Sequence, residues 1–497
     1  MKGIRESCLM LCISFLLAGC GTDGSGEGEN SAAGDPVSRY MESREGEINS
    51  ANDSVSSSGD ELPDIMENPA YNSNGRQVLT AVVVSPFRET MDRIIAYNES
   101  SSDYFIEMKS YGGGANSFEN LETQLPLEVL SGKGPDLVIW GSVNYSPALA
   151  SDRLMENLYD FMDADPDFRR GDYYENILQA FERSGGLYVL PVSFTVDTGC
   201  VKAEELEADR EVAEGWELGE MMDAYENSPH AERFSTNFTK EYQLWFICEG
   251  CMGNFVDWSS GECHFDTPQF VELLEFCNTF PEELVLPEDY NAFDYTRSGK
   301  IFWQRVQLDN PWTVAYQRIR GGDTDMLWPG YPVADGEKEQ GGGVAVPLGE
   351  CFSICQNSGN PEAAWECIKS WLTADAEREV QGIPLLRSVS EERIQDALTV
   401  EYETVDDSRQ EKIKWETSIV IIEGTEEEIK LSCITEEDAE TYRSIIENTH
   451  RSYSSDSGIL DIIMEEAGAY FGGNKDAVTV ADIIQNRVSM YVGERMK

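Results

Sequence analysis

Residues Ser131–Gly141 read SGKGPDLVIWG, and this stretch decides the fold predicted for the chain. Pro135 and the glycines around it break any preceding helix, and Leu137–Trp140 then form a short, wholly apolar run. Such a run is typical of a strand buried on both faces, which indicates a parallel α/β sheet. Because ligands of open α/β sheets bind beyond the carboxyl ends of the strands, Trp140 is predicted to lie where a ligand binds.

Two interpretations of Trp140 are compatible with this pattern. An aromatic side chain at the exit of a strand can serve as a platform on which a ligand stacks. It can equally be a core residue, since large aromatic side chains dominate protein cores. Periodicity alone does not separate the two.

The segments before this stretch predict a βαβ alternation. Leu79–Val84 and Tyr104–Met108 have the composition of strands, and Phe118–Leu130 has the apolar spacing of a helix. The loop after the first strand leaves the same sheet edge as Trp140. Three of its residues are therefore candidates for ligand contact, although the last could equally be solvated in a first helical turn: Ser85, Phe87 and Arg88.

Several phrases of the sequence resemble one protein family. They are SGKGPDLVIW, LMENLY at Leu154–Tyr159, GLYVLP at Gly186–Pro191 and NPEAAWECIKSWLT at Asn360–Thr373. These phrases are similar to those of the extracellular solute-binding proteins of ABC importers, family 1, the sugar-binding class that includes maltodextrin-binding protein. The resemblance extends from about Leu79 to the C-terminus. It implies a two-lobed periplasmic-binding-protein fold (type II), in which each lobe is a mostly parallel α/β sheet flanked by helices and the lobes are joined by hinge crossings.

The resemblance also implies where the ligand binds. The strand Leu187–Val192 would be the first crossing between the lobes, which places the next three residues on the cleft floor. Asp309–Trp312 (DNPW) is similar to the family's Gly-Pro-Trp at a sugar-stacking tryptophan, and Trp312 is the leading candidate. The complete set of ligand-binding candidates is Ser85, Phe87, Arg88, Trp140, Asn144, Tyr145, Ser193, Phe194, Thr195, Tyr242, Trp245 and Trp312.

The chain departs from the maltodextrin binders at two points. Those proteins carry an Asp-Arg pair shortly after the tryptophan, where this chain has Val143 and Asn144. The third tryptophan that they use near the C-terminus is missing here. Maltodextrin itself is therefore doubtful as the cargo, and another sugar, an oligopeptide or another polar solute remains open.

The composition excludes some partners. The chain has 497 residues, which predicts more than one core, and 37 Lys and Arg against 92 Asp and Glu give a net charge of −55. Nucleic acids and anionic lipids are polyanions, so such a chain is not expected to bind them.

The N-terminus predicts export and lipid anchoring. Lys2 and Arg5 precede the apolar run Leu9–Leu17, which is too short to span a bilayer, and Leu-Ala-Gly-Cys resembles a bacterial lipobox that ends at Cys20. The polar residues that follow predict a disordered tether whose ends lie on the order of 40 Å apart. The expected organisation is a signal peptide at 1–19, the lipidated Cys20 and tether at 20–75, a first lobe at 76–192 and 352–405, and a second lobe at 193–351 and 406–497 with an insertion at about 401–445.

Nine cysteines follow the signal region and Cys20, and an odd number cannot pair completely. Cys248 and Cys251 form a C-x-x-C that is followed by Cys263 and His264, a spacing that suits zinc. Free thiols or one exchangeable disulfide are the alternative, and the prediction is that the chain holds no metal and no cofactor.

Catalytic motifs give no positive case for an enzyme. The three histidines lie outside any H-E-x-x-H pattern, and the sequence has no G-x-S-x-G and no P-loop. The predicted function is that of a monomeric, extracytoplasmic, lipid-anchored subunit of an ABC importer, which captures a small solute, a sugar or oligosaccharide, and delivers it to a membrane permease. The alternatives are a surface glycan-binding lipoprotein without a transport role and a secreted hydrolase.

Overall fold

A computed structural model describes residues 75–84, 88–109, 111, 117–141, 149–206, 210–287, 290–334, 336–338, 341–405, 408–422, 425–453 and 456–496. These residues fall into two compact units. One unit, called the body below, contains the described residues up to Val400 and those from Cys433 onward, and the other contains Glu401–Ser432. The signal peptide, Cys20 and the tether lie outside the described residues.

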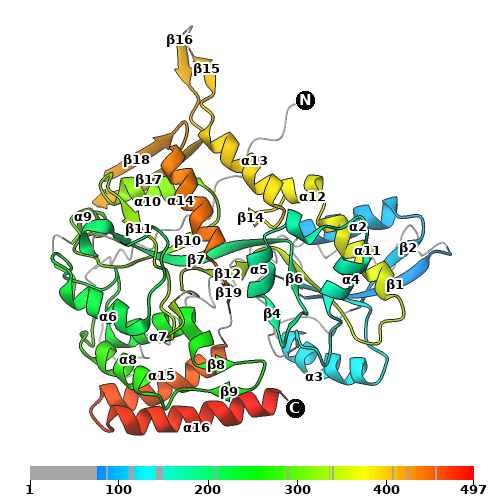
Figure 1. Cartoon of the computed structure of the whole chain (residues 1–497), viewed down its shortest axis with the longest axis horizontal. Helices are drawn as coiled ribbons and strands as arrows, with labels where there is room; N and C mark the ends of the chain where they lie inside the picture. Colours follow the sequence, from blue (N-terminus) through cyan, green and yellow to red (C-terminus); the bar gives the residue numbers. More distant parts are fainter. Residues whose placement is uncertain are drawn as a thin grey trace, which may run out of the picture. The chain divides into compact units, whose positions relative to one another are not determined.

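The body has two lobes, each built around its own sheet (Figure 1). The first sheet has the strand order β2-β1-β3-β13-β6. Its strands are β1 (Gln77–Val84), β2 (Tyr104–Lys109), β3 (Leu137–Gly141), β6 (Leu190–Pro191) and β13 (Glu350–Ile354). Its helices include α2 (Arg88–Ser100), α3 (Ser117–Leu130), α4 (Leu158–Ala164), α5 (Glu175–Ala180), α11 (Pro361–Trp371) and α12 (Ala374–Arg378). Every residue of β3 is buried, as the apolar run predicts.

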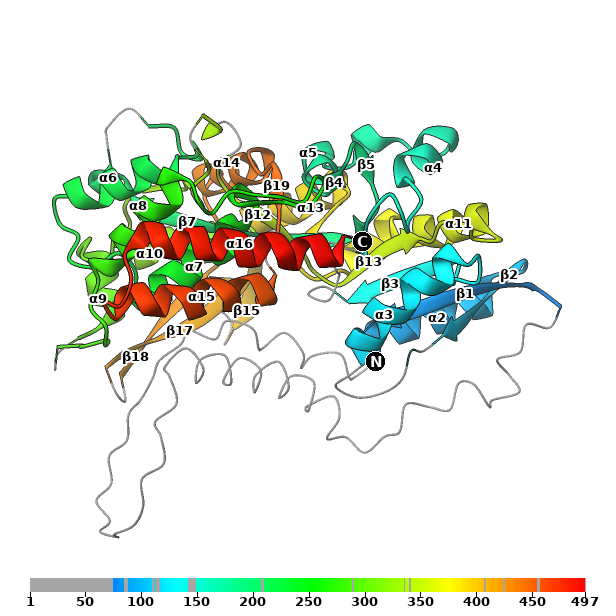
Figure 2. The ribbon, with the colours of Figure 1, turned by 90° about the horizontal axis from the view of Figure 1, so that it is seen from below.

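The second sheet has the order β10-β7-β12-β19, with two further short strands paired to β7. The strands are β7 (Ser193–Lys202), β10 (Gln304–Leu308), β11 (Met326–Leu327), β12 (Val344–Pro347), β14 (Ile383–Pro384) and β19 (Arg451–Ser452). The helices of this part are α6 (Leu218–Asn227), α7 (Lys240–Cys251), α8 (Pro268–Asn278), α9 (Ala292–Arg297), α10 (Trp312–Arg320), α14 (Glu436–Glu447), α15 (Ser457–Phe471) and α16 (Ala477–Arg495). α13 (Arg387–Leu398) follows β14 along the chain. Figure 2 shows α15 and α16 side by side.

The prediction of two α/β lobes is confirmed, but the expected strand direction is wrong for the second sheet. β1, β2 and β3 are parallel, whereas β7 is antiparallel to each of its partners β10, β11, β12 and β14. The crossings explain part of this pattern. The chain enters the second lobe along β7 and leaves it along β12, so these two neighbours must run in opposite directions.

Three segments of the chain meet at the boundary between the sheets. Val192 joins β6 to β7, and Leu348 and Gly349 join β12 to β13. The two crossings are tied together, because the Leu348 N–H donates to the Ser193 carbonyl at 3.0 Å and the Ser193 hydroxyl donates to the Leu348 carbonyl. β14 adds the third segment by pairing with Ser193 and Phe194. These contacts define the hinge region of the body.

A buried carboxyl group, that of Glu377, is bonded to the backbone two residues after β14. The Glu377 side chain in α12 is fully buried, and its Oε2 accepts from the Leu386 N–H at 2.6 Å. Its Oε1 has no hydrogen-bond partner among the described residues. Burial disfavours the charged form and raises the pKa of Glu377 from its ordinary value of 4.5 to about 8.

This shift predicts a pH dependence of stability. A group whose pKa is raised by folding stabilises the protein below its unfolded pKa, and this contribution is lost as the pH rises through the folded value. Between about pH 4.5 and 8, Glu377 should therefore lower the free energy of unfolding by at most about 1.4 kcal/mol per pH unit. Urea titrations at several pH values should show that this part of the slope disappears in Glu377→Gln. The exposed Glu362→Gln is the control, and equal slopes in both variants would contradict the prediction.

Residues 401–432 form two hairpins in their own unit, β15 (Tyr402–Val405) with β16 (Ser408–Glu411) and β17 (Trp415–Ile422) with β18 (Thr425–Leu431). The separate segment is shorter than the expected 401–445, because α14 belongs to the body. α14 carries Asp438, which accepts from Arg318 of α10 at 2.9 Å.

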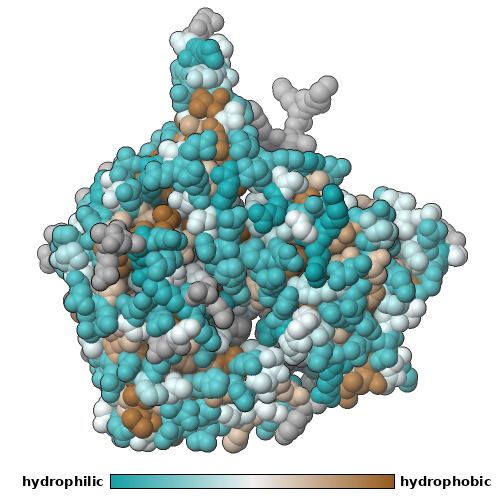
Figure 3. Space-filling model, in the orientation of Figure 1, coloured by the Kyte–Doolittle hydropathy of each residue, from teal (hydrophilic) through white to brown (hydrophobic). Residues whose placement is uncertain are grey.

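The surface fits the acidic composition. The face drawn in Figure 3 is mostly hydrophilic, with scattered apolar residues and a hollow near its centre. No helix in the described part of the chain combines the length and the apolarity needed to cross a membrane.

Candidate functional site

The candidate site lies on one face of the second sheet, close to the hinge region. β7 and β10 pair in a register that sets Asp197 opposite Gln307, so polar side chains of the two strands share this face. The residues between them face the core and include Val196 and Val306, both buried. The polar face consists of Thr195, Asp197, Arg305 and Gln307. Gln307 is exposed and Arg305 is half-buried, so this face reaches solvent.

An ion-pair network fixes the position of Arg305. Its Nε and Nη2 donate to the two carboxylate oxygens of Asp197 at 3.1 and 2.5 Å, and its Nη1 donates to Glu249 of α7 at 3.1 Å. The side chains of Asp197 and Glu249 are only 7% and 4% exposed. Their negative charges hold the pKa of Arg305 well above its ordinary value although burial acts against this. The guanidinium is therefore charged, rigid and neutralised by its own neighbours.

Aromatic side chains surround this network. The Arg305 guanidinium lies 5.4 Å from the ring of Phe246, and Tyr242 stacks on the same ring at 5.7 Å. The Tyr453 hydroxyl reaches Glu249 at 3.4 Å, and the Tyr331 hydroxyl reaches Asp197 at 3.3 Å. Tyr242, a predicted site residue, thus contacts the same Phe246 ring as Arg305.

β10 leads directly to Trp312, the leading candidate from the sequence. The Trp312 N–H donates to the side chain of Asn310 at 3.0 Å, and the Asn310 amide donates to Asp309 at 2.7 Å. These bonds form a compact turn at the start of α10, where the indole is half-buried. Gln307 is the second-last residue of β10 and Trp312 follows the end of this strand by four residues, and the Gln307 amide donates to Thr195 at 3.4 Å.

Three predicted site residues are core residues in this structure. Trp140 is 0% exposed, and its indole N–H donates to the Ser353 hydroxyl at 2.8 Å inside the first sheet. Phe194 is 0% exposed because it faces the core side of β7, where it contacts Tyr174 edge-on. Trp245 is 4% exposed in α7. Of the two interpretations of Trp140, the geometry therefore fits the core residue and not the stacking platform.

Some of the other candidates lie within the described residues, and the rest lie outside them. The Ser193 hydroxyl is buried and bonded within the hinge region, so its contact is structural. Arg88 begins α2. The remaining candidates from the first lobe, and the lipidation candidate, lie outside the described residues: Ser85, Phe87, Asn144, Tyr145 and Cys20.

The cysteines do not assemble a metal site in the described part of the chain. Cys248, Cys251, Cys263 and His264 do not come together as a group of ligands, and all nine cysteines from Cys200 onward are free thiols. Eight of them are buried, and burial raises the pKa of Cys251 to about 12, so this thiol is protonated and unreactive at neutral pH.

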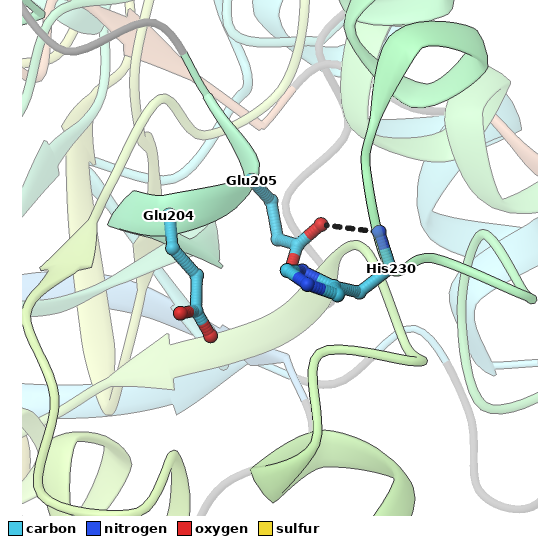
Figure 4. A group of neighbouring side chains, drawn as sticks. All are labelled: Glu204, Glu205 and His230. Atoms are coloured by element: carbon cyan, nitrogen blue, oxygen red, sulfur yellow. Dashed lines mark hydrogen bonds and ion pairs between the residues drawn. The ribbon is translucent and has the colours of Figure 1, made fainter.

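One other group has the chemistry of metal ligands. Glu204, Glu205 and His230 offer ligand atoms within 4.8 Å of one another (Figure 4). Each carboxylate, however, already has partners within the protein. Lys202 pairs with Glu204 at 2.6 Å, and Glu205 accepts from the Ser228 hydroxyl at 2.5 Å and lies 2.8 Å from His230 Nδ1. The group is an internally satisfied network, and we assign no metal to it.

Sequence reasoning missed Asp197, Arg305, Gln307 and Glu249. A signal was present for three of them, because polar and apolar residues alternate in SFTVDT and in QRVQL, as expected of strands with one polar face. Glu249 had none, since its role depends on how α7 packs beside the sheet.

The sequence of the chain is similar to that of a known protein. The chain is 23% identical over 266 residues to a maltotriose-binding protein of Pyrococcus abyssi, and the match covers 52% of this chain and 55% of that protein. The chain thus matches about half the length of that curated relative. No family model matches the chain.

Two solved structures are similar to this one. A designed cysteine esterase is 14% identical with a TM-score of 0.50, and the match covers 85% of this chain and 99% of that one. A family 1 extracellular solute-binding protein of Alicyclobacillus acidocaldarius is also 14% identical, with a TM-score of 0.49, and the match covers 85% of this chain and 100% of that one. The similarity to the designed esterase shows the fold alone, since one fold hosts many functions.

Fold and site together define a two-lobed α/β protein with a polar face beside the hinge region. Within this class, the sequence match confirms the resemblance to the sugar-binding solute-binding proteins of family 1.

Proposed function

We propose that the chain is the substrate-binding subunit of an ABC importer, which captures a sugar or oligosaccharide between its lobes and delivers it to a membrane permease. The observation that carries this proposal is the polar face of the second sheet next to the hinge region, which reaches solvent at Arg305 and Gln307, in a chain similar to a maltotriose-binding protein. A ligand that touches both lobes favours the closed state by its differential affinity.

The site residues of this proposal come from both lobes. Trp312 stacks on the apolar face of a sugar ring, while Arg305 and Gln307 donate to hydroxyl oxygens. Ser85, Phe87, Arg88, Asn144 and Tyr145 contribute from the first lobe. The lobe boundaries of this proposal are 76–192 with 352–400 and 193–351 with 433–497.

The proposal also includes the location of the protein. Cys20 carries the lipid that anchors the chain to the outer face of the cell membrane, and the following residues tether the body. The protein binds its cargo without turning it over, and the permease partner supplies the transport path.

A thermal-shift screen against a panel of sugars and peptides tests the capture function. A ligand at a hundred times its dissociation constant should stabilise the body by about 2.7 kcal/mol. The sugars that stabilise should be recovered unchanged after long incubation. A panel in which no sugar stabilises, or in which a sugar is hydrolysed, would contradict the proposal.

Trp312→Ala should weaken the binding of a stabilising sugar by about ten-fold, because a stacked aromatic contributes about 0.5–1.5 kcal/mol beyond the area that it buries. Calorimetric titration measures the change. Tyr402→Ala is the matched control, since this exposed aromatic lies in the hairpin unit. Equal affinity in wild type and Trp312→Ala would show that the site lies elsewhere.

A further inference from the structure

One ion pair joins the two lobes away from the hinge region. Arg495 Nη1, in the last turn of α16, lies 3.0 Å from Glu122 Oε1 in the second turn of α3. α16 ends beside α3 in Figure 1. These residues are 373 positions apart in the sequence, and the hinge crossings lie elsewhere along the chain.

Each helix is fixed within its own lobe. α3 is held to the first sheet by the ion pair of Glu128 with Lys109 of β2 at 2.6 Å, and its Leu125 and Val129 are buried. α16 is held to the second lobe by Gln485, whose side chain bonds to the backbone of both Cys263 and Phe265. Any change in the distance between the lobes on this side must therefore stretch or break the Arg495–Glu122 pair.

The structure also positions the arginine. The Arg495 guanidinium lies 4.8 Å from the ring of Tyr491, one turn earlier on α16. The Tyr491 hydroxyl in turn donates to Asp456 at 2.9 Å, and Asp456 caps the start of α15. Two helices of the second lobe thus hold the side chain in place, which lowers the entropy that is lost when the pair forms.

We propose that Arg495 and Glu122 form a reversible latch that holds the two lobes together on the side of α3 and α16. The pair positions the lobes and does not contact the cargo. Its importance for capture and release rests on the proposed function, whereas its effect on lobe separation does not.

The exposure of the pair suits a latch that must open. The side chains of Arg495 and Glu122 are 35% and 23% exposed, so water and salt weaken their attraction without removing it. A half-exposed ion pair shifts an equilibrium between two states by about two- to five-fold, enough to bias closure and too little to lock it.

Distance measurements between the helices test the latch without any ligand. Leu127 of α3 and Met490 of α16 are 70% and 69% exposed, so each position can carry a spin label. p-Acetylphenylalanine at both positions leaves the native cysteines untouched, and pulsed electron paramagnetic resonance then reports the distribution of distances. The labelled full chain should give one main short distance at low salt.

Arg495→Gln and Glu122→Gln should each raise the ratio of separated to latched molecules by about two- to five-fold. The charge-reversed pair Glu122→Arg with Arg495→Glu should restore the short distance, and 0.5 M NaCl should move the wild type toward the Gln variants. Arg487→Gln is the matched control, because Arg487 lies on the same helix but pairs with Glu466 within the second lobe. The same distribution in wild type and both Gln variants, or an equal shift in the control, would overturn the latch.

This outcome is independent of the ligand screen. A latch that behaves as expected in a protein that binds no sugar would refute the proposed cargo and leave the latch intact. Sugar binding without any change of distance in the Gln variants would refute the latch alone.

Discussion

Replacing Trp140 by alanine is expected to lower the free energy of unfolding by about 3–5 kcal/mol, because the indole is fully buried in the first sheet. The substitution opens a cavity between β3 and its neighbours and leaves the Ser353 hydroxyl without its indole donor. Trp140→Phe keeps most of the volume and should cost clearly less. Urea unfolding followed by far-ultraviolet circular dichroism measures both variants.

This prediction separates the two roles that the sequence allowed for Trp140. Leu127→Ala is the control, since an exposed apolar side chain contributes little and the change should stay within about 0.5 kcal/mol. If Trp140→Ala left stability unchanged but weakened the binding of a sugar, the side chain would be a stacking platform and not a core residue.

Arg305→Ala is expected to destabilise the body by about 3–5 kcal/mol, because it leaves the buried carboxylates of Asp197 and Glu249 without their counter-charge. Arg305→Lys should also destabilise, since an ammonium group cannot reproduce the bidentate contact with Asp197. The same urea titration measures the change.

A matched variant tests the cause of this loss. The triple substitution Asp197→Asn, Glu249→Gln and Arg305→Met removes all three charges and should recover most of the lost stability. Arg387→Ala is the control, because Arg387 forms an exposed pair with Glu447 and its loss should have little effect. A loss in the triple variant as large as that in Arg305→Ala would mean that Arg305 acts through packing and not through charge.

Much of the first lobe could be predicted from local sequence. The strands expected at 79–84 and 104–108 and the helix expected at 118–130 all form, with bounds that shift by one or two residues. Their apolar patterns are strong because each element buries one continuous face or both faces. The run LVIW of β3 is the clearest example.

The strand pairing of the second lobe could not be predicted, because its strands pair over long distances in the sequence. β7 pairs with β10, β12 and β14, and nothing in the local pattern of β7 indicates these partners or their direction. The start of α16 shows the same limit on a smaller scale. Asp476 and Thr479 are both residue types that cap helices, and the structure shows that Asp476 caps this one and accepts from the Thr479 N–H at 2.9 Å.

The candidate site could be predicted only in part. Trp312 was found through a resemblance to a family motif, and the structure places it four residues after the end of β10, the strand that carries Arg305 and Gln307. The roles of Asp197, Arg305 and Glu249 follow from three elements that pack together, and a single sequence contains no direct signal for such an arrangement. Trp140 shows the opposite case, in which a strong local pattern did not distinguish a ligand platform from a core side chain.

A crystal structure of the protein with a sugar that stabilises it tests the central claim most directly. The account predicts that the sugar lies between the lobes, with a ring stacked on Trp312, hydroxyl groups near Arg305 and Gln307, and further contacts from the first lobe. A sugar bound to the outer surface of one lobe, or to the hairpin unit at 401–432, would contradict it.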